Sequence, residues 1–63
     1  MSGSILFETL VEGTGLPSEY VRNRLERLIE RHGYTVQGLS VDQARELASS
    51  LLLDLIQESL QEQ

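Results

Sequence analysis

The segment from Val41 to Leu60 most constrains what this chain can form, because its apolar surface is too wide for a helix on the outside of a small protein. At about 100° per residue, the apolar side chains spread over an arc of about 180°, whereas a surface helix needs only about 100°. They are Val41, Ala44, Leu47, Ala48, Leu51, Leu52, Leu55 and Ile56, extended by Leu53 and Leu60. This helix therefore needs cover on more than one side.

The length of the chain limits where that cover can come from. A chain of 63 residues forms one domain at most and buries only about 60% of the surface that it exposes when unfolded. Small domains usually recover stability from disulfides, a metal or self-association. The sequence has no cysteine and one histidine, His32, which excludes disulfides and argues against a structural zinc site. Self-association is the remaining route.

We therefore expect the helix at about 41–60 to pack on a second copy of the chain. The alternative is that the other helices of the same chain wrap it completely. Under the first interpretation, its large side chains form the oligomer interface. The predicted interface residues are Leu47, Leu51, Leu52, Leu55 and Ile56.

The segment from Pro17 to His32 has the clearest helical pattern and holds four of the five arginines. Its apolar side chains fall within an arc of about 100° on a helical wheel; they are Val21, Leu25, Leu28 and Ile29, joined by His32. One flank carries Tyr20, Arg24, Arg27 and Arg31, and the far side carries Glu19, Glu26 and Glu30. The pattern predicts an amphipathic helix with apolar, arginine-rich and acidic strips.

Like charges three and four residues apart on the arginine-rich strip repel each other, so we expect an anionic group nearby. That group is nucleic-acid phosphate, an acidic partner protein, or an acidic helix of the same fold. Asp54 and Glu58, at the margin of the last helix, are candidates to pair with Arg24, Arg27 or Arg31. A plain alternative is a solvated strip whose charge is screened by water and salt.

The remaining signals complete an all-α prediction of three helices, at about 5–12, 17–32 and 41–60, with a short extended segment at 34–36. Ser4 is the expected N-cap of the first helix, and Ser40 with Gln43 predicts a capping box for the third. Gly33 ends the second helix. We expect a single domain, 1–63, with residues 1–3 and 61–63 frayed, packed as a homo-oligomeric helical bundle.

No catalytic or metal-binding arrangement can be assembled from the sequence. His32 is expected on the apolar side of its helix, where a lone histidine is more often a partly buried residue than a base. The segment Gly13-Thr14-Gly15 lacks the lysine that phosphate-binding loops require. We therefore expect no enzyme activity, cofactor, metal or small-molecule substrate.

With no signal-peptide pattern and no long apolar run, we expect a cytoplasmic protein without a membrane segment.

The segment from Leu10 to Tyr34 resembles the helix-turn-helix of winged-helix transcription regulators. The resemblance rests on Thr14-Gly15-Leu16 in the turn and on Val21, Arg24, Leu25, Leu28, Gly33 and Tyr34 in and after the second helix. It implies that helix 17–32 is a recognition helix for the DNA major groove. The segment covers about 25 residues; no complete helix precedes it and no two-stranded wing follows. The net charge of −5 also opposes approach to phosphate.

The leading functional prediction is a small non-enzymatic interaction or regulatory module. It self-associates through helix 41–60 and contacts an acidic protein partner through the arginine-rich flank of helix 17–32. The alternative is a small DNA-binding regulator that uses helix 17–32. Both interpretations use the same contact residues, namely Tyr20, Arg22, Asn23, Arg24, Arg27 and Arg31.

Overall fold

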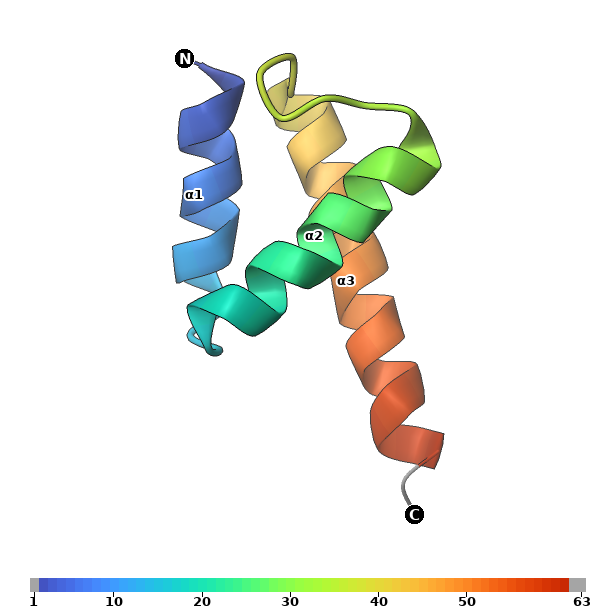
Figure 1. Ribbon diagram of the computed structural model, residues 1–63. Coiled ribbons are helices and arrows are strands. Elements are labelled where there is room, and N and C mark those ends of the chain that lie inside the picture. Colours follow the sequence, from blue (N-terminus) through green and yellow to red (C-terminus); the bar gives the residue numbers. More distant parts are fainter. Residues whose placement is uncertain (1, 62–63) are drawn as a thin grey trace.

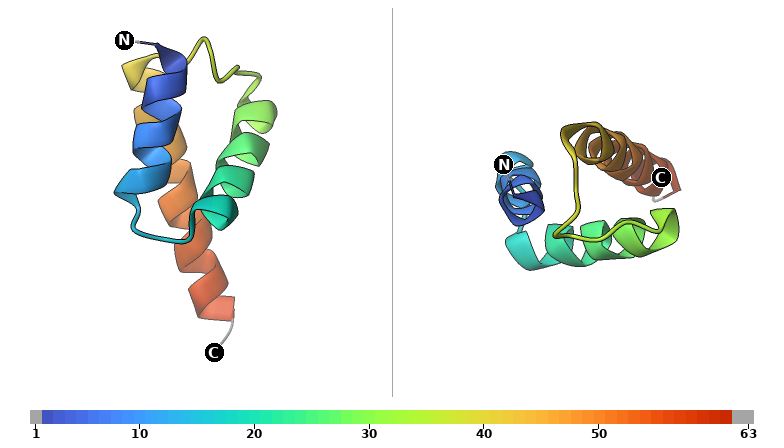
Figure 2. Two further views of the ribbon diagram at one scale, coloured as in Figure 1. Left: turned by 60° about the vertical axis from the view of Figure 1, so that its left-hand side comes forward. Right: turned by 90° about the horizontal axis from the view of Figure 1, so that it is seen from above.

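The computed structural model describes residues 2–61, which form three α-helices: α1 (Gly3–Gly13), α2 (Ser18–His32) and α3 (Val41–Gln61). The chain descends through α1, returns through α2 and descends again through α3 (Figure 1). Viewed from above, the three helices enclose a triangle (Figure 2). The all-α prediction is confirmed for this part of the chain. Of the ends expected to fray, residues 1, 62 and 63 lie outside it.

The core lies inside the triangle and takes side chains from all three helices. Burial of this apolar surface is the main stabilising contribution to such a fold. The predicted apolar strip of α2 is confirmed, because four of its members are buried. The core consists of Phe7 and Val11 from α1, Val21, Leu25, Leu28 and Ile29 from α2, Leu39 from the following loop, and Leu47 and Leu51 from α3.

The ends of α2 and α3 follow from local sequence. Gly33 ends α2 with a φ of +76°, and the N–H of Tyr34 donates to the carbonyl of Ile29 at 3.0 Å, which is the glycine-based termination expected. The capping box of α3 is confirmed: Ser40 and Gln43 each accept from the other's backbone N–H, at 3.1 and 3.2 Å. The end of α2 and the start of α3 are therefore set by the residues at those positions.

The start of α1 differs from the prediction. Ser2, not Ser4, is the N-cap, and its hydroxyl accepts a hydrogen bond from the N–H of Ile5. Gly3, expected to be frayed, is helical and buried, and Gln61 at the other end of the chain is also helical. Both serines have the right side chain for a cap, so the tertiary contact of Gly3 decides between them.

The expected extended segment at 34–36 is part of the loop between α2 and α3, and residues 2–61 contain no strand. The loop closes on itself instead, because Gly38 N–H donates to the Thr35 hydroxyl at 3.0 Å and Leu39 N–H donates to the Val36 carbonyl at 3.4 Å. No neighbouring strand is present in the described chain to pair with a β-prone segment. The loop packs on the start of α1.

α3 is the longest helix, with 21 residues against 11 in α1 and 15 in α2. At 1.5 Å per residue it is about 31 Å long, compared with about 16 and 22 Å for the others. Its C-terminal end therefore extends past the other two helices (Figure 1). None of the helices within residues 2–61 has both the length and the apolar content that a membrane crossing requires.

The contact between Gly3 and the α2–α3 loop gives the first prediction. A methyl group at Gly3 would overlap the carbonyl oxygens of Val36 and Gln37, and backbone cannot move aside as a side chain can. We expect Gly3→Ala to lower the free energy of unfolding by about 1–3 kcal/mol, measured by urea denaturation.

Gly13→Ala is the matched control, because nothing lies within 4 Å of a methyl group there. Alanine is a better helix former than glycine, so this variant should be neutral or stabilised by up to about 1 kcal/mol. Equal stability of Gly3→Ala and the native chain would show that the loop does not press on α1.

Candidate interaction surfaces

The arginine-rich flank of α2 meets α3 in a polar group that we call the Glu58 cluster, consisting of Tyr20, Arg24 and Glu58. Arg24 forms a salt bridge with Glu58, and the Tyr20 hydroxyl donates to the same carboxylate at 3.1 Å. The Arg24 guanidinium also lies over the Tyr20 ring, 5.4 Å from its centroid. An acidic residue of the same chain therefore neutralises one member of the arginine flank.

Arg22 has a similar internal partner in α1. Its guanidinium binds the Glu8 carboxylate through both terminal nitrogens, one of them at 3.0 Å, and lies 5.8 Å from the centre of the Phe7 ring. The hydrogen bond from Arg22 holds the pKa of Glu8 below its ordinary value; desolvation opposes this effect and the arginine charge adds to it. The pair joins α1 to α2 on the surface.

The C-terminal end of α2 is joined to α3 through Glu46. The Tyr34 hydroxyl donates to Glu46 at 2.9 Å, and His32 Nδ1 lies 3.4 Å from the other carboxylate oxygen. The two rings stack with centroids 5.3 Å apart. The hydrogen bond to Glu46 raises the pKa of the Tyr34 phenol, because it stabilises the protonated form. His32 thus has a structural partner at the surface.

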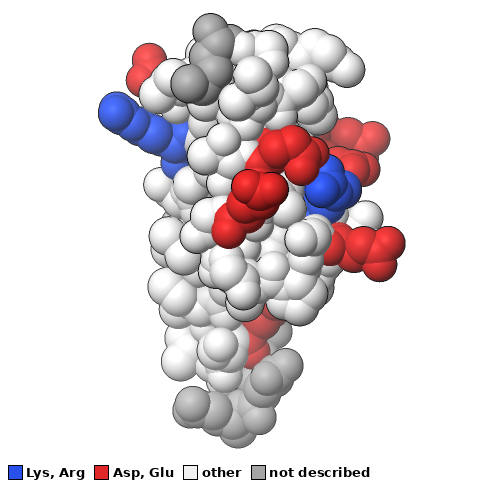
Figure 3. Space-filling view, turned by 90° about the vertical axis from the view of Figure 1, so that its left-hand side faces the viewer, with Lys and Arg blue, Asp and Glu red and all other residues white. Residues whose placement is uncertain are grey.

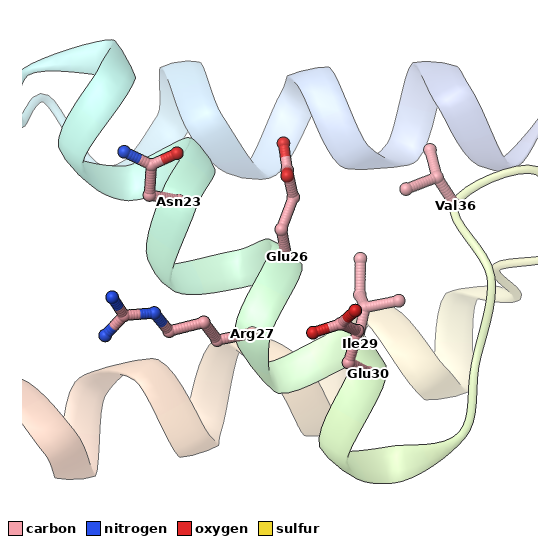
Figure 4. Close-up of a pocket in the computed structure, with 6 residues that line it drawn as sticks. All are labelled: Asn23, Glu26, Arg27, Ile29, Glu30 and Val36. Carbon is pink, nitrogen blue, oxygen red and sulfur yellow. The ribbon is translucent and has the colours of Figure 1, made fainter.

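Arg27 and Arg31 differ from the two paired arginines of α2. Both are exposed, and neither has a salt-bridge partner among residues 2–61. Arg27 lines a shallow recess with Asn23, Glu26, Ile29, Glu30 and Val36, where Ile29 and Val36 lie at one end (Figure 4). The carboxylates and the guanidinium alternate along α2 and do not surround a common point, so this recess is poorly arranged for a small ligand.

The exposed side of α3 carries four of the eight large apolar side chains that the structure leaves exposed within residues 2–61. We call it the α3 stripe and define it by four side chains that each expose more than half of their surface: Leu52, Leu53, Ile56 and Leu60, at 60%, 61%, 54% and 65%. At 100° per residue they lie within an arc of about 100°. In the view of Figure 3, charged side chains gather over the upper half and the lower part is largely uncharged.

The residues assigned to the oligomer interface fall into two groups. Leu47 and Leu51 are buried in the core of the chain, with 0% and 3% exposure, so they are not available to a second copy. Leu55 is partly buried against that core, and only Leu52 and Ile56 lie fully on the outside. The 180° arc thus combines a core-facing side with an exposed side.

A hollow of about 480 Å³ lies beside the α3 stripe, between α1 and α3. Its walls include Leu10 from α1, Leu16 from the turn, and Leu52 and Leu55 from α3, and no charged residue lines it. Leu16, which is 39% exposed, faces this hollow. Leu52 belongs to both the hollow and the stripe, so the two form one continuous apolar area.

Searches of known protein families, curated proteins and solved structures find no significant match to this chain. Within residues 2–61, no three histidine, aspartate or glutamate side chains are grouped as metal ligands would be. The function of the chain is therefore inferred from its surfaces. Of the two carboxylates expected to pair with the arginine flank, Asp54 and Glu58, the one that binds Arg24 is Glu58. Glu58 could be expected because it lies at the margin of the apolar arc of α3, whereas the positions of Glu8 and Glu46 carry no such signal.

The Glu58 cluster can be tested with a double-mutant cycle. We expect a coupling of about 0.5–1 kcal/mol between Arg24→Gln and Glu58→Gln in the free energy of unfolding, the upper part of the range for surface pairs.

The matched control is the cycle of Arg27→Gln with Glu58→Gln. Arg27 lies on the same flank and near Glu58 without a salt bridge to it, so its coupling should be close to zero. Equal coupling in the two cycles would contradict a specific Arg24–Glu58 pair and would favour a general charge effect.

Proposed function

We propose that this chain is a small non-enzymatic interaction module that self-associates through α3. The observation that carries the proposal is the α3 stripe, a continuous row of large apolar side chains on the outside of the longest helix. Scattered exposed leucines are ordinary on protein surfaces, whereas contiguous apolar patches mark interaction sites. The neighbouring uncharged hollow enlarges the patch.

The dimensions of the chain support the same conclusion. The accessible surface is 4489 Å², whereas a compact monomer of 7.1 kDa exposes about 4,100 Å². The radius of gyration is 11.6 Å, compared with about 10.6 Å for a compact domain of this length. The protruding end of α3, which carries much of the stripe, contributes to this excess. A second copy placed there removes the excess surface from water.

The other contact surface in the proposal is the part of the arginine flank that remains available. Arg24 is held by Glu58, so an acidic partner protein would be bound by Arg27 and Arg31, which lie four residues apart and are exposed. Arginine binds carboxylates through two parallel hydrogen bonds. In this proposal α3 forms the contact between copies of the chain, and α2 binds the acidic partner protein.

Self-association is tested by placing a charge on the α3 stripe. We expect Ile56→Asp to convert the assembly to a monomer, because a carboxylate cannot be buried in an apolar interface without a partner. Ile56 is 54% exposed, so the helical circular dichroism spectrum should be retained. The molar mass is measured by light scattering across a concentration series.

Gln57→Asp provides the control, since it changes the charge equally at an exposed position of the same helix outside the stripe. It should associate as the native chain does. A native chain that stays monomeric at about 1 mM, or an Ile56→Asp variant that retains the native mass, would overturn the proposal.

DNA binding through α2 is the alternative, and the short turn from Thr14 to Pro17 between α1 and α2 is the observation in its favour. DNA binding has less support, because Arg22 and Arg24 are bound by carboxylates of the chain, which phosphate would have to displace.

We expect no change in the fluorescence anisotropy of a labelled random DNA duplex when the chain is added at about 50 mM salt. Binding that disappears in an Arg22→Gln/Arg27→Gln variant would favour the alternative.

A further inference from the structure

We propose that two copies of α3 pair in antiparallel orientation, with the midpoint of the contact between Leu52 and Leu53. This inference rests on the proposed self-association and adds the orientation and the register of the two chains. It follows from which residues occupy the exposed side of α3, from the position of Arg45 on that side, and from the shape of the chain.

The exposed positions on this side of α3 are symmetric along the helix. From residue 45 to residue 60 they are Arg45, Ser49, Leu52, Leu53, Ile56 and Leu60, all exposed, and at 100° per residue they fall within an arc of about 100°. A two-fold axis between Leu52 and Leu53 places Ser49 at the level of the partner's Ile56, and Arg45 at the level of the partner's Leu60. The small serine therefore leaves room for the large isoleucine, which allows the helices to approach closely.

The charge of Arg45 selects the antiparallel orientation. In a parallel pair, the two Arg45 side chains would lie at the same level of the interface and repel each other. In the antiparallel pair they are about 22 Å apart along the axis, beyond the screening length of about 8 Å at physiological salt. Each Arg45 then lies near the C-terminal end of the partner's α3, where the helix dipole favours a cation.

The shape of the chain favours a midpoint at residues 52 and 53 over one nearer the C-terminus. A midpoint at Ile56 would also bring apolar residues together, but the contact would extend only from about residue 52 to the end of α3. With the midpoint at 52 and 53, α3 overlaps its copy from about residue 45 to residue 60. The protruding end of each helix (Figure 1) then lies along the exposed N-terminal half of the other.

Single cysteines introduced on the stripe test this arrangement, and the chain has no cysteine of its own to interfere. A disulfide needs Cα atoms within about 7 Å. Leu53→Cys should form a disulfide-linked dimer under mild oxidation, because the two copies of residue 53 are about 1.5 Å apart along the axis. Ser49→Cys alone should not, because its two copies are about 10 Å apart along the axis. A mixture of Ser49→Cys and Ile56→Cys chains should form the mixed dimer.

Ser49, Leu53 and Ile56 are exposed, so these variants should keep the native helical spectrum, and Gln57→Cys controls for random collision. A dimer in which Ser49→Cys links to itself as efficiently as Leu53→Cys would overturn the antiparallel orientation. A dimer in which no stripe cysteine links more than Gln57→Cys would place the interface elsewhere. A monomer by light scattering would overturn the proposed self-association itself. This measurement therefore distinguishes a failure of self-association from a failure of the antiparallel arrangement.

Discussion

The apolar surface of α3 is the constraint on which the rest of the structure depends. α1 and α2 are too short to cover a helix of 21 residues, and they bury only the side that carries Ala44, Leu47 and Leu51. The leucines on the opposite side of α3 are exposed to solvent. The same helix therefore contributes to the core of the chain and also exposes a row of large apolar side chains. The proposed function follows from this division between the two sides.

Polar contacts hold the helices in this arrangement and account for much of the charge on α2. Three acidic residues from α1 and α3 contact α2 and the start of the following loop. Glu8 binds Arg22, Glu58 binds Arg24, and Glu46 contacts His32 and Tyr34. Each pair is near the surface, where its contribution to stability is small. Arginines used in this way are less available to phosphate, which lowers the support for DNA binding.

The resemblance to a helix-turn-helix rests on local features that a helical hairpin of another function also needs. The turn requires Gly15, which has a φ of +71°, and the packing of the two helices requires Val21 and Leu25, which are fully buried. These residues satisfy the geometry of two helices joined by a short turn, whatever the pair binds. The exposed side of α2 carries the functional information, and two of its arginines face carboxylates of the same chain.

The sequence by itself determined the three helices, the capping box of α3, the glycine that ends α2 and the buried strip of α2, because each depends on residues within a few positions of one another. It also indicated that α3 has more apolar surface than one neighbour can cover. Tertiary structure decided which leucines of α3 face inward: Leu47 and Leu51 were expected at an oligomer interface and lie in the core. It also moved the cap of α1 from Ser4 to Ser2, through the close approach of Gly3 to a loop more than thirty residues away. Helical periodicity shows which residues share a side of a helix, but the direction from which another helix approaches depends on contacts between distant parts of the chain.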